Sequence, residues 1–197
     1  RPMRLGFVLF VAVLVIIFGC SSDGDPSPSG GSPASEVSVN CAVDLPPSVL
    51  DQIYGGIVTE LFTLSPSSSD KKCQYQAGVS PRSQMTVGVS VQGTGDEGSV
   101  RDYFNRMKST AISMGGNPNW TPAPFSKEWN RDLSFWSGYY GVKAPPSPAQ
   151  TTTLNLHAVA DTGQKITISL TYYGDTDSNS LGSATEKLAS RVHQVIA

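Results

Sequence analysis

The sequence predicts an α+β domain in which a single antiparallel sheet of about five strands is packed by helices, in the order α-β-β-α-β-β-β-α. Apolar and polar residues alternate along residues 84–92 and along both arms of a hairpin at residues 154–172, the pattern of strands with one buried face. Apolar residues recur every three or four positions along residues 99–114 and 180–197, the pattern of amphipathic helices. Short turns between neighbouring strands favour antiparallel pairing.

The first half of the domain is expected to contain one helix and two strands. A proline pair precedes apolar positions at helical spacing, which predicts a helix over residues 47–61, weakened by the Gly-Gly pair at 55–56. A polar loop then leads to a short strand at residues 73–77. The alternating residues 84–92 form the next strand, buried on one face.

The second half begins with a helix that Asp96 or Ser99 can cap and that stops at the glycines 115–116. Residues 117–131 have no clear period and predict an irregular, aromatic-rich loop, whereas residues 133–142 predict a strand. The hairpin follows, and the last helix can lie on the apolar face of the sheet.

The N-terminal segment is typical of a secretory signal. Two arginines precede an apolar run at residues 5–18, which spans only about 21 Å as a helix and is short for a hydrocarbon core of about 30 Å. The residues that end this run, with Gly19 before Cys20, resemble the lipobox of bacterial lipoproteins. This resemblance implies that residues 1–19 are removed and that Cys20 is lipidated and becomes the N-terminus. The alternative is an uncleaved membrane anchor that ends in a chance cysteine.

Residues 20–40 are then the lipidated cysteine and a flexible tether, because they are rich in Ser, Pro and Gly and nearly devoid of apolar side chains. Residues 41–197 have the length of a single domain. Stable anchoring by lipid takes two or more acyl chains, since one chain binds membranes only marginally.

The remaining two cysteines are expected to pair. Once Cys20 is assigned to lipid, Cys41 and Cys73 are left, and an exported chain folds in an oxidising compartment. A disulfide between them is therefore predicted. The alternative is two free, buried thiols.

The charge pattern excludes nucleic acid as a partner. Removal of residues 1–19 takes Arg1 and Arg4 from the 14 basic residues and none of the 16 acidic ones, which leaves a net charge of about −4. A mildly acidic chain without a basic run lacks the electrostatic footprint that nucleic-acid binding requires.

No catalytic, metal or cofactor site is predicted. The two histidines, His157 and His193, have no nucleophile motif beside them and no third ligand at metal spacing. The glycines mark turns and helix ends and form no phosphate-binding loop.

One aromatic-rich region is a candidate contact surface. It comprises Trp120, Phe125, Trp129, Phe135, Trp136, Tyr139 and Tyr140. In a strand at 133–142, Phe135 and Tyr139 point to one face and Trp136 and Tyr140 to the other. One interpretation is that the 117–131 loop folds over these rings and buries them. The other is a patch that binds a glycan, a lipid tail or a protein, formed by Trp120, Trp129, Trp136 and Tyr140.

The layout resembles that of small uncharacterised envelope lipoproteins of actinobacteria, of the mycobacterial type. The resemblance is carried by the lipobox at Cys20, the Ser/Pro/Gly tether, Cys41 shortly before a helix, and Cys73-Gln74-Tyr75 at the start of a strand. It implies a location and a fold and brings no established activity.

Taken together, these observations predict a lipid-anchored protein on the extracytoplasmic face of the cell membrane. We expect a non-enzymatic binding or adaptor module whose partner is an envelope protein, a glycan or a lipid. The alternatives are an enzyme acting on envelope polymers, which needs a cleft with positioned catalytic groups, and a lipid carrier, which needs a cavity between sheet and helices.

Overall fold

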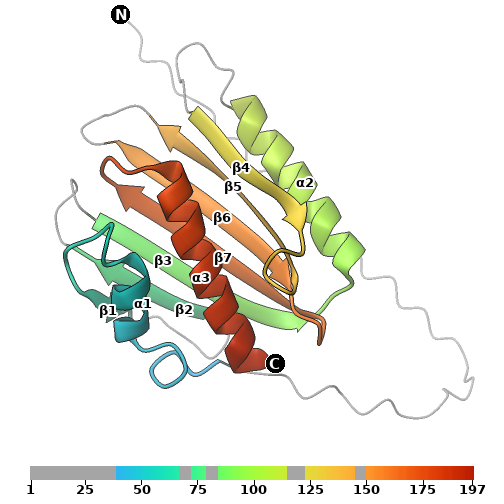
Figure 1. The fold of residues 1–197 in the computed structure, drawn as a ribbon, viewed down its shortest axis with the longest axis horizontal. Helices are drawn as coiled ribbons and strands as arrows, with labels where there is room; N and C mark the ends of the chain where they lie inside the picture. The colour runs from blue at the N-terminus through green and yellow to red at the C-terminus, as the bar shows by residue number, and fades with distance from the viewer. Residues whose placement is uncertain (1–38, 67–71, 79–83, 115–122, 145–149) are drawn as a thin grey trace, which may run out of the picture. The chain divides into compact units, whose positions relative to one another are not determined.

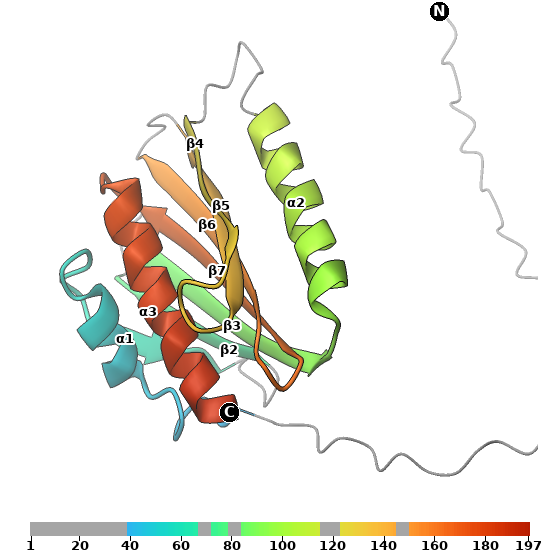
Figure 2. The same ribbon diagram turned by 45° about the vertical axis from the view of Figure 1, so that its right-hand side comes forward.

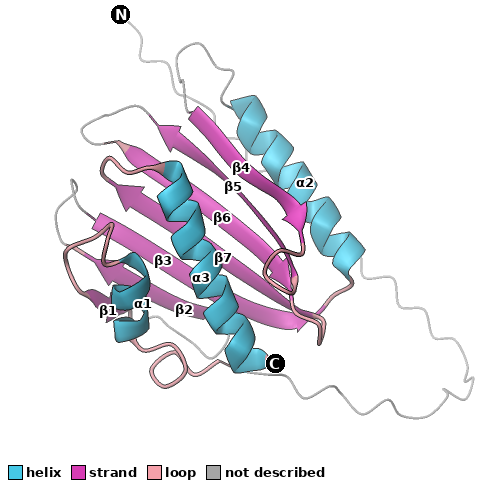
Figure 3. Cartoon of the chain, in the orientation of Figure 1, coloured by secondary structure: helices cyan, strands magenta, loops and turns pink. Residues whose placement is uncertain are grey.

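Seven antiparallel strands form one sheet in the order β1-β2-β3-β7-β6-β5-β4, and three helices pack against it (Figure 1, Figure 3). These counts refer to the residues that the computed structural model describes, 39–66, 72–78, 84–114, 123–144 and 150–197. The elements are α1 (Pro47–Tyr54), β1 (Phe62–Leu64), β2 (Lys72–Ala77), β3 (Gln84–Thr94), α2 (Glu97–Met114), β4 (Ala123–Asn130), β5 (Trp136–Ala144), β6 (Thr151–Val159), β7 (Gln164–Tyr173) and α3 (Ser178–Ile196).

The predicted α+β class with a single antiparallel sheet is confirmed, but the predicted strand number is wrong. The sheet has seven strands in place of about five, and the order is α-β-β-β-α-β-β-β-β-α. The two missed strands, β1 and β4, are the two edges of the sheet. β1 has three residues, too few to show an alternation.

β4 lies where the sequence predicted a loop, at residues 117–131. Its pairing with β5 shifts register between Lys127 and Asn130, where β4 has one more residue than its partner. Such a bulge interrupts the two-residue alternation that identifies a strand in a sequence. The aromatic-rich segment is therefore an edge strand beside β5.

The first helix is shorter than the predicted 47–61. It ends at Tyr54, and the N–H of Gly55 makes the last helical bond to the carbonyl of Asp51, at 2.9 Å. The carboxylate of Asp51 also accepts a hydrogen bond from the backbone N–H of Phe62, at 2.8 Å. This bond directs the chain after the Gly-Gly pair back along the helix and into β1.

One face of the sheet carries α1 and α3, as Figure 2 shows from the side. The alternating apolar residues of β3, β6 and β7 point to this face and are almost completely buried. They meet the apolar stripe of α3, which includes Leu181, Leu188 and Val192. Tyr54 joins the two helices, because its hydroxyl lies 3.2 Å from the hydroxyl of Thr185. This face of the sheet holds the main core.

A disulfide joins the start of the domain to β2. Cys41 and Cys73 are bonded, with their Cα atoms 5.4 Å apart, so the predicted pairing is confirmed. Both cysteines are buried. Tyr75 lies on the same face of β2 as Cys73, and its hydroxyl donates a 2.6 Å hydrogen bond to the carbonyl of Leu45. The segment before α1 is therefore joined to β2 at two points.

The opposite face is covered only in part. α2 packs there against β4, β5 and β6. Phe104 of α2 is fully buried and lies directly over Gly138 of β5, where a side-chain carbon would come within 2.8 Å of the ring. The second face of β2, β3 and β7 lies beyond this helix, and it forms the site described below.

Several predicted features lie outside the described residues, namely the signal segment, Cys20, the tether up to residue 38, and Trp120. Within the described part of the chain, no helix is both long and apolar enough to cross a membrane.

Candidate binding groove

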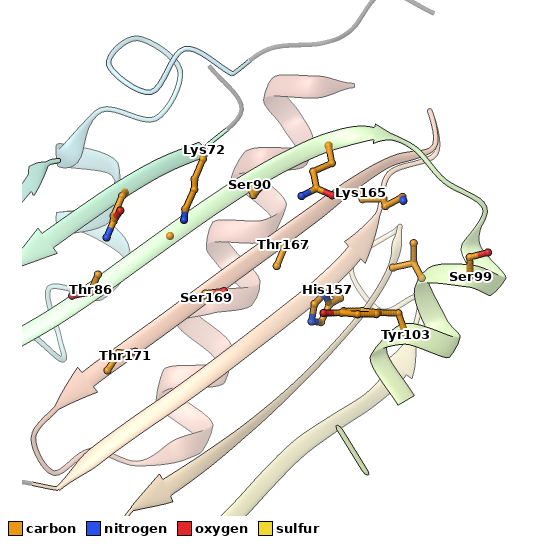
Figure 4. A pocket seen from close by; sticks show the side chains of 14 residues that line it. Lys72, Thr86, Ser90, Ser99, Tyr103, His157, Lys165, Thr167, Ser169 and Thr171 are labelled. Atoms are coloured by element: carbon orange, nitrogen blue, oxygen red, sulfur yellow. The ribbon is translucent and has the colours of Figure 1, made fainter. Parts of the chain in front are cut away.

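A groove of about 750 Å³ lies on the half of the second sheet face that α2 does not cover (Figure 4). Its floor is formed by β2, β3 and β7, and its wall by the first turns of α2 together with His157 of β6. The floor residues are the outward positions of the same strands whose inward positions form the core. Two-residue alternation thus produces the core and the groove from the same segments.

Strand register brings the floor residues into rows. Lys72 of β2 pairs with Ser90 of β3, Ser90 with Thr167 of β7, and Thr167 with His157 of β6. In the next row Gly88 pairs with Ser169. Neighbouring strands are about 4.8 Å apart, so each row places hydrogen-bonding groups at regular intervals across the groove.

The wall contains a buried histidine within a group of aromatic rings. The imidazole of His157 stacks on the ring of Tyr140 at 5.8 Å between centroids and meets the ring of Tyr103 edge-on at 5.4 Å. Its Nε2 atom lies 3.5 Å from the Tyr140 hydroxyl. Burial lowers the pKa of His157 to about 4 and raises that of Tyr140 to about 12, so both groups are neutral at pH 7.

The positive charges of the groove come from Lys72 and Lys165, and no lining residue is a carboxylate. Asp96, the cap of α2, lies nearby, and its carboxylate accepts a 2.8 Å hydrogen bond from the backbone N–H of Ser99. Hydrogen bonds from the hydroxyl and backbone of Ser99 hold the pKa of Asp96 below its usual value, and the charge of Lys165 adds a smaller effect. The groove is therefore polar and locally positive on an acidic chain.

The aromatic residues predicted as a contact patch differ in how far they are buried. Tyr140 is buried at 6% exposure beneath Phe104, with the two ring centroids 5.9 Å apart. Trp136, on the same face of β5, is 36% exposed. Trp129 is half-buried, and Trp120 lies outside the described residues. Tyr140 is thus part of the packing under α2, and Trp136 is the most open of the described members.

The bulge in β4 explains the position of Trp129. Glu128 reaches Lys108 on α2, and Trp129, the next residue, also turns toward α2. Its Nε1 atom donates a 2.6 Å hydrogen bond to the carboxylate of Glu97. Two consecutive side chains reach the same helix because the extra residue interrupts the alternation.

The side chains in and just before β5 point alternately to the two faces of the sheet, as the sequence predicted. Phe135, just before β5, stacks on His193 of α3 at 4.4 Å between ring centroids, and Tyr139 packs against Gly182 of the same helix. Both lie on the α3 side, opposite to Tyr140. His157 and His193 are therefore separated by the sheet. Among the described residues, no group of three or more His, Cys, Asp or Glu side chains could hold a metal ion.

Sequence reasoning missed the groove. The alternation along residues 84–92 and 154–172 places Ser90 and Thr167 at outward positions, but it does not show that they are neighbours, because the pairing of β3 with β7 joins segments far apart in the chain. The available signal was the outward face of β3 and β7, where most positions carry short hydroxyl side chains, namely Thr86, Ser90, Thr167, Ser169 and Thr171.

The fold and the groove define a disulfide-bonded α+β protein with a polar groove on a half-covered sheet. No protein-family model matches the chain, and a comparison with curated proteins found no match. Among solved structures, the chain is similar to the Ran-binding protein Mog1p of Saccharomyces cerevisiae, with 12% identity over 72% of this chain and 86% of that one and a TM-score of 0.33. A mutant of Mog1 gives 10% identity over 66% and 75%, with a TM-score of 0.33. Likenesses this weak carry no inference about function.

Proposed function

We propose that this protein is a lipid-anchored module on the extracytoplasmic face of the cell membrane that binds a glycan of the cell envelope without transforming it. The observation that carries the proposal is the open polar groove over β2, β3 and β7. The Cys41–Cys73 disulfide supports an extracytoplasmic location, because stable disulfides are typical of oxidising compartments.

The lining of the groove favours a hydroxyl-rich ligand. Its volume lies within the range of about 300 to 1,000 Å³ that is usual for small-molecule sites. Ser90, Thr167 and Ser169 supply hydroxyls that both donate and accept hydrogen bonds, and Gln74 supplies an amide. Tyr103, 43% exposed at the wall, supplies an aromatic surface. Hydroxyls, amides and an aromatic ring together suit the polar edges and apolar faces of sugar rings.

Two features favour binding over catalysis. The ring of His157 bonds to Tyr140, and no hydroxyl of the floor hydrogen-bonds to it in the described structure. With a pKa of about 4, this imidazole is also a weak base near neutral pH. A nucleophile with an adjacent, oriented base is what an enzyme of the hydrolase type would require.

A lipid carrier is disfavoured by the packing of the other face. The space between the sheet and α3 is filled by side chains with no measurable exposure, including Leu154, Leu156, Ile166 and Leu188. The groove itself has a polar floor. Neither region offers the apolar cavity that an acyl chain needs.

Blocking the groove tests the proposal. In Ser169→Trp, an indole placed on the exposed floor should abolish binding of the full chain, in detergent, to an array of envelope-type oligosaccharides. Ser126→Trp is the matched control, because Ser126 is an exposed strand residue of β4 outside the groove. Unchanged binding by Ser169→Trp, or no binding of any array member by the unmodified chain, would contradict the proposal.

The anchor is tested separately by mass spectrometry of the protein extracted from membranes. We expect an N-terminal Cys20 that carries acyl chains, and release of Cys20→Ala from the membrane fraction. An unmodified Cys20 that still follows residues 1–19 would contradict the lipoprotein assignment while leaving the groove untouched.

A further inference from the structure

The charges of the groove differ from those of the surrounding surface. The chain has a net charge of −2, yet the groove contains two lysines and no carboxylate among its lining residues. Other described lysines near the sheet are paired, as in Lys108–Glu128, Lys127–Glu186 and Lys143–Asp175. Within the described residues, neither Lys72 nor Lys165 forms an ion pair with a carboxylate. The positive charge of Lys165 does help to lower the pKa of Asp96.

The two lysines flank the central strand of the floor. Lys72 of β2 pairs with Ser90 of β3, and Lys165 of β7 pairs with Gln92, two residues further along β3. Strand spacing and rise then place their Cα atoms roughly 12 Å apart, with the Ser90 hydroxyl between them (Figure 4). In the structure the end of the Lys165 side chain lies beside Gly95, on the side away from Lys72. Each ammonium group sits on a flexible four-carbon stem, so a change of rotamer at Lys165 would let both approach one anion held over β3.

The space above this strand is open. Gly88 lies next to Ser90 on the same face, and a side-chain carbon added there would meet nothing closer than the Ser169 carbonyl oxygen, at 3.8 Å. The half-buried Ser90 and Thr167 lie in the row that starts at Lys72. An anion near Lys72 would therefore have neutral hydroxyl donors beside it, which strengthens anion binding without a competing negative charge.

From this arrangement we infer that the groove selects acidic glycans over neutral ones, and that Lys72 and Lys165 hold the acidic group while the Ser and Thr hydroxyls of β3 and β7 bind the sugar hydroxyls. This inference rests on the proposed function and specifies its ligand class. A uronic carboxylate and a sugar phosphate share the chemistry that the lysines recognise. Nucleic acid is a poor fit because the acidic chain repels a long polyanion.

The test uses oligosaccharides in matched versions: neutral, with one sugar oxidised to its uronic acid, and with one sugar phosphorylated. The full chain in detergent should bind at least one acidic version about tenfold more tightly than its neutral parent at low salt, and the difference should shrink as salt rises. Comparison of the uronic and phosphorylated versions identifies the source of the acidic group.

Charge variants assign the preference to the two lysines. The double variant Lys72→Met/Lys165→Met should lose the preference, and Lys72→Arg/Lys165→Arg should keep it. The matched control is Lys187→Met/Arg191→Met, which removes two exposed positive charges from α3, on the opposite face of the sheet.

The outcomes separate this inference from the proposed function. Equal binding of all matched versions, with binding still lost in Ser169→Trp, would overturn the acidic preference and leave glycan binding standing. An acidic preference that survives in Lys72→Met/Lys165→Met would overturn the assignment to these lysines. Failure of every version to bind would overturn both proposals.

Discussion

His157 gives the structure a specific sensitivity to acid. An unfolded chain protonates an ordinary imidazole near pH 6.5, but burial against Tyr103, Phe104 and Tyr140 lowers the pKa of His157 to about 4 in the folded protein. Between these two values the unfolded state binds one proton more than the folded state. The free energy of unfolding must therefore fall as the pH falls through this window.

The size of the effect follows from the two pKa values. A shift from 6.5 to about 4 corresponds to about 3 kcal/mol of stability lost between pH 7 and pH 4, with a slope of up to about 1.4 kcal/mol per pH unit. Asp96 and Asp177 also have lowered pKa values, and their contributions are lost as the pH falls through those lower values. They are present in every variant compared here, so they cancel in the difference.

The assay is urea unfolding at pH 7, 6, 5 and 4.5, followed by circular dichroism. His157→Phe keeps a ring of similar size and removes the titrating group, so its stability should fall less steeply with acid than that of the unmodified protein. His193→Gln is the control, since it removes the other histidine and leaves His157 in place. Parallel pH profiles for the unmodified protein and His157→Phe would refute the assignment of the acid sensitivity to this imidazole.

Three further predictions concern the packing that supports the groove. Reduction of the disulfide, which joins residues 32 apart in sequence, should lower the free energy of unfolding by roughly 3 to 4 kcal/mol in urea titrations with and without reductant; an unchanged midpoint would contradict this. Gly138→Ala should lower the free energy of unfolding by about 1 to 3 kcal/mol because the new carbon would lie 2.8 Å from the Phe104 ring, whereas Gly88→Ala on the open floor should leave it unchanged or raise it by up to about 1 kcal/mol. Equal losses for the two variants in urea titrations would contradict the close packing of α2 on Gly138. Trp129→Phe should lose about 1 kcal/mol with its 2.6 Å hydrogen bond to Glu97, and Trp136→Phe much less, as measured by thermal unfolding; the reverse order would be inconsistent with the described contacts.

The elements with regular periodicity were predictable from the sequence alone. Residues 84–92 fall inside β3, and the hairpin and last helix were placed within a few residues of their observed bounds. Asp96 caps α2 as one of the two predicted alternatives. In each case burial of one face imposes a period that is visible in the residue order, because the same face meets the core throughout the element.

The missed features depend on contacts between distant segments. The short β1 is recognisable only through its pairing with β2, and β4 only through its pairing with β5. The groove requires β7 to lie beside β3 and α2 to cover the other half of the face. An amphipathic helix pattern predicts that α2 packs on a sheet, but the pattern contains no information about which strands it covers.

The disulfide determines how a mechanical load from the N-terminal side enters the domain. The described residues begin just before Cys41, and its bond to Cys73 leads any tension directly into β2. The residues between the two cysteines, which include α1 and β1, are bypassed, so roughly 100 Å of extendable chain stays slack while the bond is intact. Lys72 is the residue before Cys73. A force applied between the N-terminal side of Cys41 and a ligand held at Lys72 would therefore be transmitted through the disulfide and one peptide bond. The disulfide thus links the N-terminal side directly to the strand that carries Lys72, and α1 and β1 lie outside this path.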